Sequence, residues 1–198
     1  MRTEKQAARR AEIEDAAFRI LLEKGYAATS MLSVAQAAGA SNETLYRWYG
    51  DKVGLFKALV ERNALSISAP LSAAIEAGAP PSKVLQKIGP KLLALLTGDR
   101  AVALNRAAAA DADQTGVLGA TLAKSGRNSV KPLFVQLFSA SVGRVEAEAV
   151  AETYLSLLIG ETQTHRVTGA RKLLRRTEID LRAAHAWHCL RAIYPQVA

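Results

Sequence analysis

Apolar residues recur every three or four positions along most of the chain, which is the period of an amphipathic α-helix. The first such run spans residues 8–24, and its buried stripe consists of Ile13, Ala16, Ala17, Ile20 and Leu21. Gly25 can end this helix, because glycine adopts left-handed backbone conformations. The alternation typical of β-strands is not evident anywhere. The pattern therefore predicts an all-α protein.

Short polar residues that can cap helices divide the next part of the chain. The predicted caps are Ser30 for a helix over 31–38, Ser41 for a short helix over about 42–48, and Asp51 for a longer helix that begins at Lys52. The first two of these helices are joined by a tight turn that contains Gly39. Two short helices joined in this way form a helix-turn-helix pattern.

Beyond residue 62 the pattern is looser. Breaks are expected at Pro70 and at the run GAPPS, residues 78–82. Further helices are expected over 83–96, over 99–110 with Asp99 as cap, and over 116–141, 146–166 and 177–194. Within 116–141, Gly126 and Pro132 should produce a kink or a break.

Three aromatic residues lie close together in the second helix of this pattern, although aromatic residues make up only 6% of the chain. They are Tyr46, Trp48 and Tyr49. Leu45 should point inward, while the polar residues around it point outward. A helix this short is not stable alone. It must be held by its neighbours while it offers its polar face to a partner.

The net charge of +8 favours a nucleic acid, an acidic ligand or an anionic surface as partner. However, residues 1–62 hold 10 Lys and Arg against 8 Asp and Glu, whereas residues 63–198 hold 16 against 10. The overall charge therefore does not locate a nucleic-acid surface. The run RKLLRR, residues 171–176, is interpreted as a solvated loop, with an acidic-ligand or phosphate site as the alternative.

Several classes of protein are not expected. One cysteine, Cys189, excludes an internal disulfide, and no segment resembles a signal peptide or approaches the roughly 20 apolar residues of a membrane span. We therefore expect a cytoplasmic protein without a membrane partner.

No nucleophile and base stand out together, so neither catalysis nor a cofactor is predicted. His185, His188 and Cys189 lack a fourth metal ligand, and packing or a dimer contact is preferred to a metal site.

The stretch GYAATSMLSVAQAAGASNETLYRWYGDKVGLFKAL, together with the first helix, closely resembles the TetR family of one-component bacterial transcriptional regulators. The resemblance covers about 50 residues, and the rest of the chain matches only in its layout of helices. It implies a three-helix DNA-binding head, residues 1–50, and a ligand-binding and dimerisation body, residues 51–198, with helix 51–67 linking the two. Such proteins usually repress by binding a palindromic operator as dimers, and a small-molecule effector releases them.

The resemblance places the short helix 42–48 in the major groove of double-stranded DNA. Asn42 can pair with adenine and Glu43 can accept from cytosine, although Glu43 could instead only favour the helix N-terminus. Tyr49 should pack inward. Gly54 should weaken its helix by about 0.5–1 kcal/mol relative to alanine. The expected DNA contacts are Ser30, Ser33, Ser41, Asn42, Glu43, Thr44, Tyr46, Arg47, Trp48 and Lys52.

Two sets of residues are candidates in the body. A stripe at helical spacing, formed by Tyr154, Leu158 and His165, could line the effector pocket, or it could belong to the core or to a dimer contact. Phe134 and Phe138 could line the same pocket or belong to the core. The last two long helices are expected to pair with those of a second copy. The residues expected at that interface are Ala147, Ala151, Leu155, Ala184, Trp187 and Leu190.

Two alternatives remain open at this level. The protein could be a regulator that activates or that responds to no ligand. It could also be a helical ligand-binding or scaffolding dimer whose head does not bind DNA. The intact motif LYRWYGDK argues against the second alternative.

Overall fold

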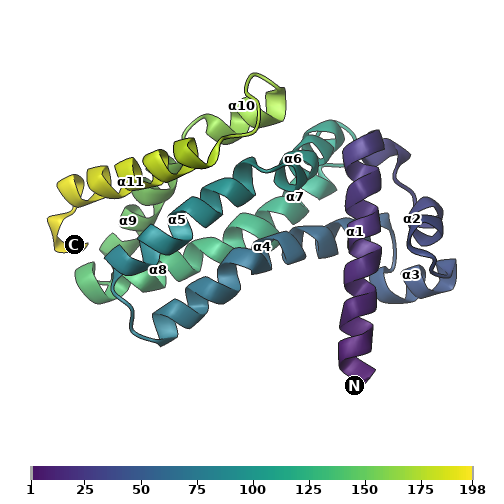
Figure 1. The fold of residues 1–198 in the computed structure, drawn as a ribbon, viewed down its shortest axis with the longest axis horizontal. Helices are drawn as coiled ribbons and strands as arrows, with labels where there is room; N and C mark the ends of the chain where they lie inside the picture. The colour runs from purple at the N-terminus through teal and green to yellow at the C-terminus, as the bar shows by residue number, and fades with distance from the viewer. Residues whose placement is uncertain (1, 198) are drawn as a thin grey trace.

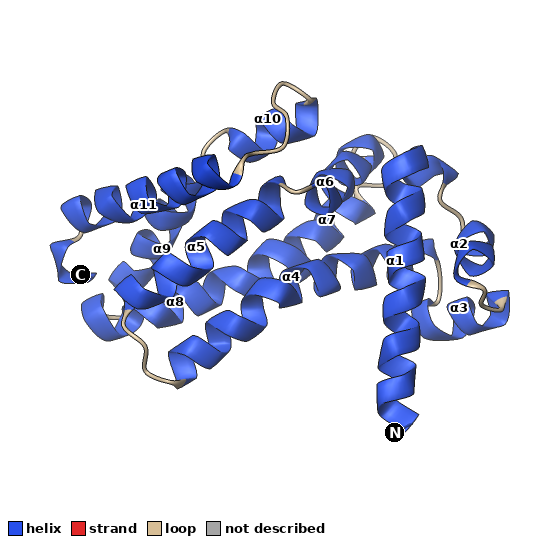
Figure 2. Cartoon of the chain, in the orientation of Figure 1, coloured by secondary structure: helices blue, strands red, loops and turns tan. Residues whose placement is uncertain are grey.

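The computed structural model describes residues 2–197, with side chains from residue 4 onward. The helices are α1 (Arg2–Ala28), α2 (Met31–Ala38), α3 (Asn42–Tyr49), α4 (Lys52–Glu76), α5 (Pro81–Thr97), α6 (Asp99–Asp111), α7 (Val117–Leu122), α8 (Asn128–Val142), α9 (Arg144–Ile159), α10 (Thr162–Thr168) and α11 (Arg176–Ile193). A π-helical turn, Ala123–Arg127, joins α7 to α8, and a 3-10 turn, Pro195–Val197, follows α11. The described chain contains no strand (Figure 2), which confirms the predicted all-α class.

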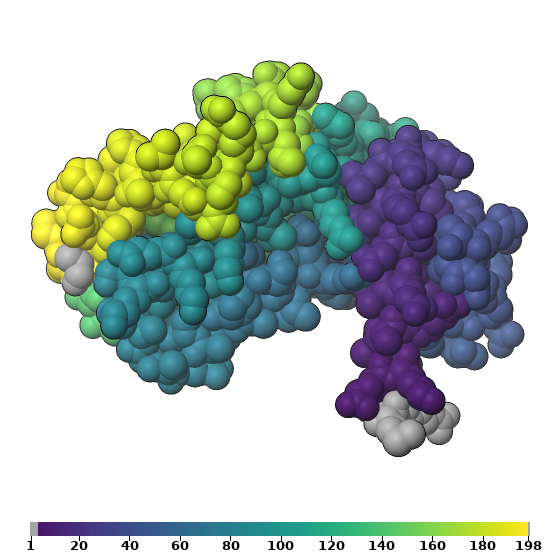
Figure 3. Space-filling view, in the orientation of Figure 1, coloured from purple at the N-terminus to yellow at the C-terminus, as the bar shows by residue number. Residues whose placement is uncertain are grey.

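Helices α1 to α3 form a head at one end of the molecule, and α4 runs from this head along the body (Figure 1). Helices α5, α8, α9 and α11 make up the far part of the body, while α6, α7 and α10 lie nearer the head. The first turns of α1 project beyond the rest of the surface (Figure 3). The long helix α4 is thus a continuous connection between head and body.

The caps predicted at Ser30, Ser41 and Asp51 are confirmed. Ser30 and Ser33 form a capping box, in which each side-chain oxygen accepts from the backbone N–H of the other residue at 3.0 Å. The Ser41 oxygen accepts from the Thr44 N–H at 3.1 Å, and the Asp51 carboxylate accepts from the Gly54 N–H at 2.7 Å. Because each cap satisfies backbone donors at a helix start, α2, α3 and α4 begin at fixed positions.

Other predicted boundaries were wrong. Pro70 does not break α4, which continues to Glu76, so the linking helix is longer than 51–67. The proline removes one donor to the carbonyl of Ser66, an exposed residue that water can solvate. Asp99 is the first residue of α6, not its cap.

The single helix expected over 146–166 is divided into α9 and α10. Gly160 ends α9 with φ 48° and ψ −137°, a conformation that favours glycine. The Arg182 Nε donates to the carbonyl of Leu158 at 2.6 Å, and a side chain at Gly160 would collide with the same guanidinium. A contact from α11 therefore accompanies this break.

The buried apolar side chains form two separate clusters. The head cluster joins α1, α2, α3 and the first half of α4, and it also includes Leu104, Ala107 and Leu118 from α6 and α7. The body cluster joins the second half of α4 to α5, α8, α9 and α11. No helix of the described residues is long and apolar enough to cross a membrane.

Candidate functional site

The polar face of α3 is open to solvent, as predicted. Leu45 has no exposed surface and packs into the head cluster, whereas Asn42, Glu43 and Tyr46 are exposed, Tyr46 by 51%. Glu43 and Arg47 lie 3.9 Å apart as an exposed ion pair. Thr44 is half-buried, with its hydroxyl 2.8 Å from that of Ser41. The helix therefore offers amide, carboxylate, phenol and guanidinium groups on one side.

The hydroxyls at the N-terminus of α2 are partly engaged within the cap. Ser33 Oγ accepts from the Ser30 N–H and donates to the Ser30 carbonyl at 2.9 Å. Ser30 Oγ accepts from the Ser33 N–H. The Ser30 hydroxyl proton thus remains available for an anion near this helix start.

Trp48 and Tyr49 pack against the head cluster. The Arg10 guanidinium lies 5.5 Å from the Trp48 ring centre. The inward packing predicted for Tyr49 is confirmed, and its hydroxyl donates to the Glu14 carboxylate at 3.3 Å. Burial raises the pKa of Glu14, while nearby Arg62 acts in the opposite direction. These contacts fix the last turn of α3 on α1.

Lys52 at the start of α4 lies against the end of α1. Its ammonium is 4.0 Å from the centre of the Tyr26 ring and 3.4 Å from the carbonyl oxygen of Ala27. Burial lowers the pKa of Lys52. The sequence analysis missed Tyr26. It follows Gly25, whose φ of 74° turns the chain at this point.

The end of α3 also requires a glycine in the next helix. A Cβ at Gly54 would lie 1.8 Å from the carbonyl oxygen of Tyr49, which is a backbone atom. The expectation that Gly54 only weakens α4 is thus incomplete. The residue allows α3 and α4 to meet at this angle.

Two cations and two acids tie the head to the body. Arg62 of α4 contacts Glu14 at 3.4 Å and Asp15 at 3.0 Å. Arg100 of α6 contacts the same Asp15 carboxylate at 2.8 Å, and its guanidinium lies 4.7 Å from the centre of the Phe18 ring. None of these tertiary pairs was predicted.

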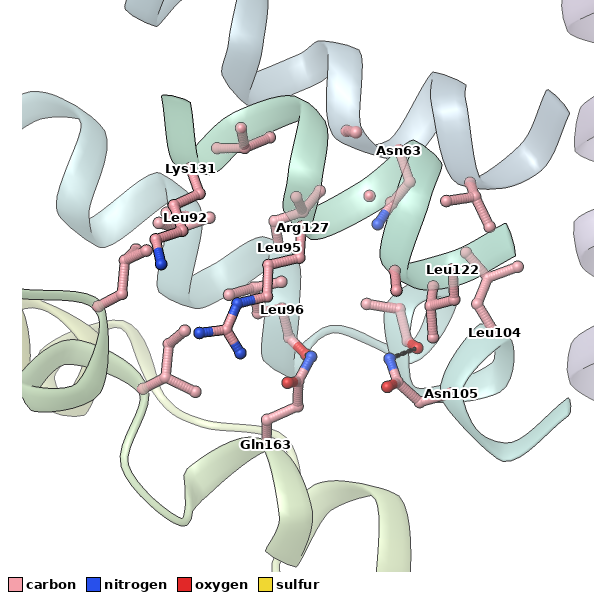
Figure 4. Close-up of a pocket in the computed structure, with 18 of the residues that line it drawn as sticks. Asn63, Leu92, Leu95, Leu96, Leu104, Asn105, Leu122, Arg127, Lys131 and Gln163 are labelled. Atoms are coloured by element: carbon pink, nitrogen blue, oxygen red, sulfur yellow. Dashed lines mark hydrogen bonds between the residues drawn. The ribbon is translucent and has the colours of Figure 1, made fainter. Parts of the chain in front are cut away.

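A cavity of about 610 Å³ lies between the head cluster and the body cluster. Its apolar wall includes Val60 and Leu104 of the head cluster and Leu92 and Leu155 of the body cluster. Its polar groups come from six helical segments, and those of Asn63, Asn105, Arg127, Lys131 and Gln163 surround one open space (Figure 4). The polar lining residues are Asn63, Asn105, Arg127, Lys131, Glu152, Ser156 and Gln163.

A second hollow of about 900 Å³ lies between the end of α1, the start of α4 and helices α6 and α10. Many of its lining groups are charged and already paired. Arg166 donates to Asp99 at 2.7 Å, and Arg106 donates to the carbonyl of Val167 at 2.8 Å. The first cavity is therefore the better candidate for a small organic molecule, because such sites are mostly apolar with few polar groups.

Comparison with known protein families identifies the family to which this chain belongs. The model for bacterial regulatory proteins of the tetR family matches residues 13–59, and the model for the C-terminal domain of AefR-like transcriptional repressors matches residues 83–196. The chain belongs to the TetR family of transcriptional regulators. It is a DNA-binding regulator, and the family is not enzymatic, in agreement with the sequence analysis.

Solved structures share the fold of this TetR-family regulator. A proposed TetR-family regulator from Mesorhizobium loti MAFF303099 matches with a TM-score of 0.78 and 22% identity, covering 94% of this chain and 96% of that one. A TetR regulator from Agrobacterium tumefaciens gives 0.74 and 25%, covering 93% and 94%. FadR from Bacillus subtilis, in complex with stearoyl-CoA, gives 0.68 and 14%, covering 91% and 96%. No curated protein matches.

The pocket stripe expected in this TetR-family regulator does not line the cavity. Phe134, Phe138, Tyr154 and Leu158 have no exposed surface and pack in the body cluster. His165 is exposed on α10, 3.7 Å from Glu161. The cavity instead meets an adjacent face of α9, formed at helical spacing by Glu152, Leu155, Ser156 and Ile159.

The interface residues expected in the body of this regulator are also mostly internal. Ala147, Ala151, Trp187 and Leu190 are buried within one chain, and Leu155 lines the cavity. Only Ala184 of that set is exposed. The remaining exposed face of α11 carries Leu181, His185 and His188.

Two polar clusters of the regulator have local partners. Cys189 Sγ is 3.5 Å from His185 Nε2, and the described residues contain no group of three potential metal ligands. In the RKLLRR segment, Arg171 and Arg175 pair with Glu178, and Arg176 pairs with Asp180.

Proposed function

We propose that this TetR-family protein is a cytoplasmic repressor that binds a palindromic operator as a dimer and leaves it when a small molecule fills the body cavity. The DNA-binding surface in this proposal is the exposed polar face of α3, a helix that is held in place by helix caps on both sides of it. In the dimer two copies of α3 would lie about 34–36 Å apart, one turn of DNA. The repressor assignment is supported by the likeness of residues 83–196 to AefR-like transcriptional repressors.

Asn42 is the residue best placed to read a base. It lies in the first turn of α3, it is exposed, and its amide makes no hydrogen bond within the described residues. An asparagine amide can pair with both polar atoms of the adenine edge in the major groove. Tyr46 and Trp48 would then contact phosphate or sugar, together with Thr44, Ser41, Ser30 and Lys52.

The proposal is tested by fluorescence anisotropy with duplexes from the region upstream of the gene. We expect Asn42→Ala to weaken binding by about 1–3 kcal/mol and to relax the preference at one base pair per half-site. Lys52→Ala should weaken binding to all sequences and lower the salt slope by about one unit. Lys87→Ala, an exposed lysine of α5, is the matched control. Uniform weakening by Asn42→Ala would refute base readout, and no preference of the native protein over random DNA would refute operator binding.

The cavity is the proposed effector site because its walls join both clusters. An occupant would contact Leu104 on α6 and Leu92 on α5 together, and α6 also holds the head through Arg100. A ligand that favours a different spacing of these helices would therefore change the placement of α3. The stearoyl-CoA complex of the B. subtilis FadR supports an effector role for small molecules in this fold.

The proposed dimer uses the exposed face of α11. Leu181 is 72% exposed, and His185 and His188 follow it at helical spacing on the same side. We expect Leu181→Asp to convert the dimer into a monomer in sedimentation equilibrium, because a charge would then be buried in an apolar contact. Leu65→Asp, at a leucine of α4 that is 61% exposed, should leave the dimer intact. A Leu181→Asp protein that stays dimeric would place the interface elsewhere.

A further inference from the structure

The charged groups of the body cavity all lie together on one side of it. Arg127 ends the π-helical turn and Lys131 follows four residues later in α8. Both donate to the carboxylate of Glu152 on α9, Arg127 to Oε1 at 2.6 Å and Lys131 to Oε2 at 2.5 Å. The two cations therefore share one carboxylate as their hydrogen-bond acceptor.

The cavity wall carries a net positive charge. Its lining includes Arg127, Lys131 and Glu152, and its other polar residues are neutral amides and a serine. Glu61, which lies near the π-helical turn through a contact with Ser125, is paired with Lys57 and does not line the cavity. One cation thus lacks a carboxylate of its own within the cavity wall.

The rest of the wall is suited to an apolar molecule. Leu92, Leu95, Leu96, Leu104, Leu122 and Ile159 line it. The amide nitrogens of Asn105 and Gln163 donate to backbone carbonyls at 2.8 and 3.2 Å, so these side chains are held in place. The volume of about 610 Å³ lies in the usual range for sites that bind small organic ligands.

We infer that this cavity binds an amphipathic organic anion, with its apolar part against the leucines and a single carboxylate between Arg127 and Lys131. This inference rests on the proposed function, which makes the cavity the effector site. The ligand carboxylate would take over hydrogen bonds that Glu152 now accepts. Glu152 can yield them at small cost, because the side chains of Glu152, Arg127 and Lys131 are 44%, 62% and 34% exposed and such pairs contribute little.

The first test is calorimetric titration of the full-length protein with decanoate, decan-1-ol and decylammonium. Decanoate should bind about tenfold more tightly than decan-1-ol, because hydrogen bonds to an ionised group are the stronger ones. Decylammonium should bind most weakly. Equal affinities for the acid and the alcohol, or a preference for the ammonium, would overturn the inference.

Chain length tests whether the apolar part enters the cavity. From octanoate to decanoate the affinity should rise by about 15-fold, as expected for two buried methylene groups. A parallel titration with 2-naphthoate distinguishes an aromatic acid from a straight-chain acid. Either acid can be preferred under the inference, but affinities independent of apolar size would contradict it.

Variants locate the carboxylate site. Arg127→Met and Lys131→Met should each reduce the preference for decanoate over decan-1-ol several-fold while leaving decan-1-ol binding nearly unchanged. Lys124→Met is the matched control, because Lys124 belongs to the same π-helical turn, is exposed and does not line the cavity. Unchanged preferences in Arg127→Met and Lys131→Met would refute the assignment.

Glu152→Gln should have the opposite effect on decanoate binding to that of Arg127→Met and Lys131→Met. Removing the competing carboxylate should tighten decanoate binding and weaken decylammonium binding, whereas a structural role alone would weaken both.

Failure of this inference is distinct from failure of the proposed function. If another compound releases operator DNA while decanoate and 2-naphthoate do not bind, only the ligand class is wrong. If decanoate binds as described but no operator is bound, the repressor proposal fails and the cavity assignment stands.

Discussion

Gly54→Ala is expected to abolish operator binding and to lower the free energy of unfolding by at least about 3 kcal/mol, the upper end of the usual cost of overpacking. The added Cβ would lie 1.8 Å from the Tyr49 carbonyl oxygen. A flexible side chain could move aside, but this oxygen belongs to the last turn of α3. The start of α4 must therefore move away from α3, and the cap from Asp51 to the Gly54 N–H would be strained.

Urea denaturation and anisotropy with upstream DNA measure the two effects. Gly119→Ala is the matched control, because Gly119 lies in α7 and an added Cβ would meet nothing within 4 Å. That control should gain about 0.5–1 kcal/mol from the better helix propensity of alanine and should bind DNA normally. Native-like stability of Gly54→Ala would show that the α3–α4 contact is not as tight as described.

Arg166→Met should lower the free energy of unfolding by about 3 kcal/mol, the lower end of the cost of breaking a buried ion pair. The Arg166 side chain is only 10% exposed. It donates to the carbonyls of Thr97 and Arg171 at 2.9 and 3.2 Å and to the Asp99 carboxylate at 2.7 Å. Its loss would leave the carbonyl of Thr97, a residue with no exposed surface, without this hydrogen bond. The lower end of the usual cost of breaking a buried ion pair is expected because the Asp99 side chain is itself well exposed.

The exposed Arg175 provides the comparison. Its side chain is 82% exposed and pairs with Glu178, so Arg175→Met should change the free energy of unfolding by no more than about 0.5 kcal/mol. Arg166→Lys should recover little, because an ammonium cannot reproduce the planar fork that reaches three acceptors. Equal losses for Arg166→Met and Arg175→Met in urea denaturation would contradict the structural role of Arg166.

The sequence was sufficient for features that depend on a few neighbouring residues. Ser30, Ser41 and Asp51 were recognised as caps because a short polar side chain at a helix start satisfies nearby backbone N–H groups wherever it occurs. The burial of Leu45 and the exposure of Tyr46 followed from helical periodicity. The break near 78–82 was recognised from the Gly and Pro residues of that run, and it lies between α4 and α5.

The sequence failed where a distant contact decides the outcome. The break at Gly160 coincides with a contact from Arg182 on α11, and the requirement for Gly54 depends on the Tyr49 carbonyl. Pro70 was expected to end α4, but one missing hydrogen bond at an exposed site did not suffice. Periodicity identifies an apolar helix face but not what covers it. The stripe with Tyr154 and Leu158 was therefore compatible with a pocket, with the core and with a dimer contact.

The position of the cavity between two hydrophobic clusters has a consequence for how the protein melts. Each cluster is a packing unit of its own, and the cavity lies between the two. A molecule that fills this space touches both units and stabilises the folded state in proportion to its binding. Occupancy therefore makes the unfolding of the N-terminal region and the rest of the chain more nearly a single cooperative transition.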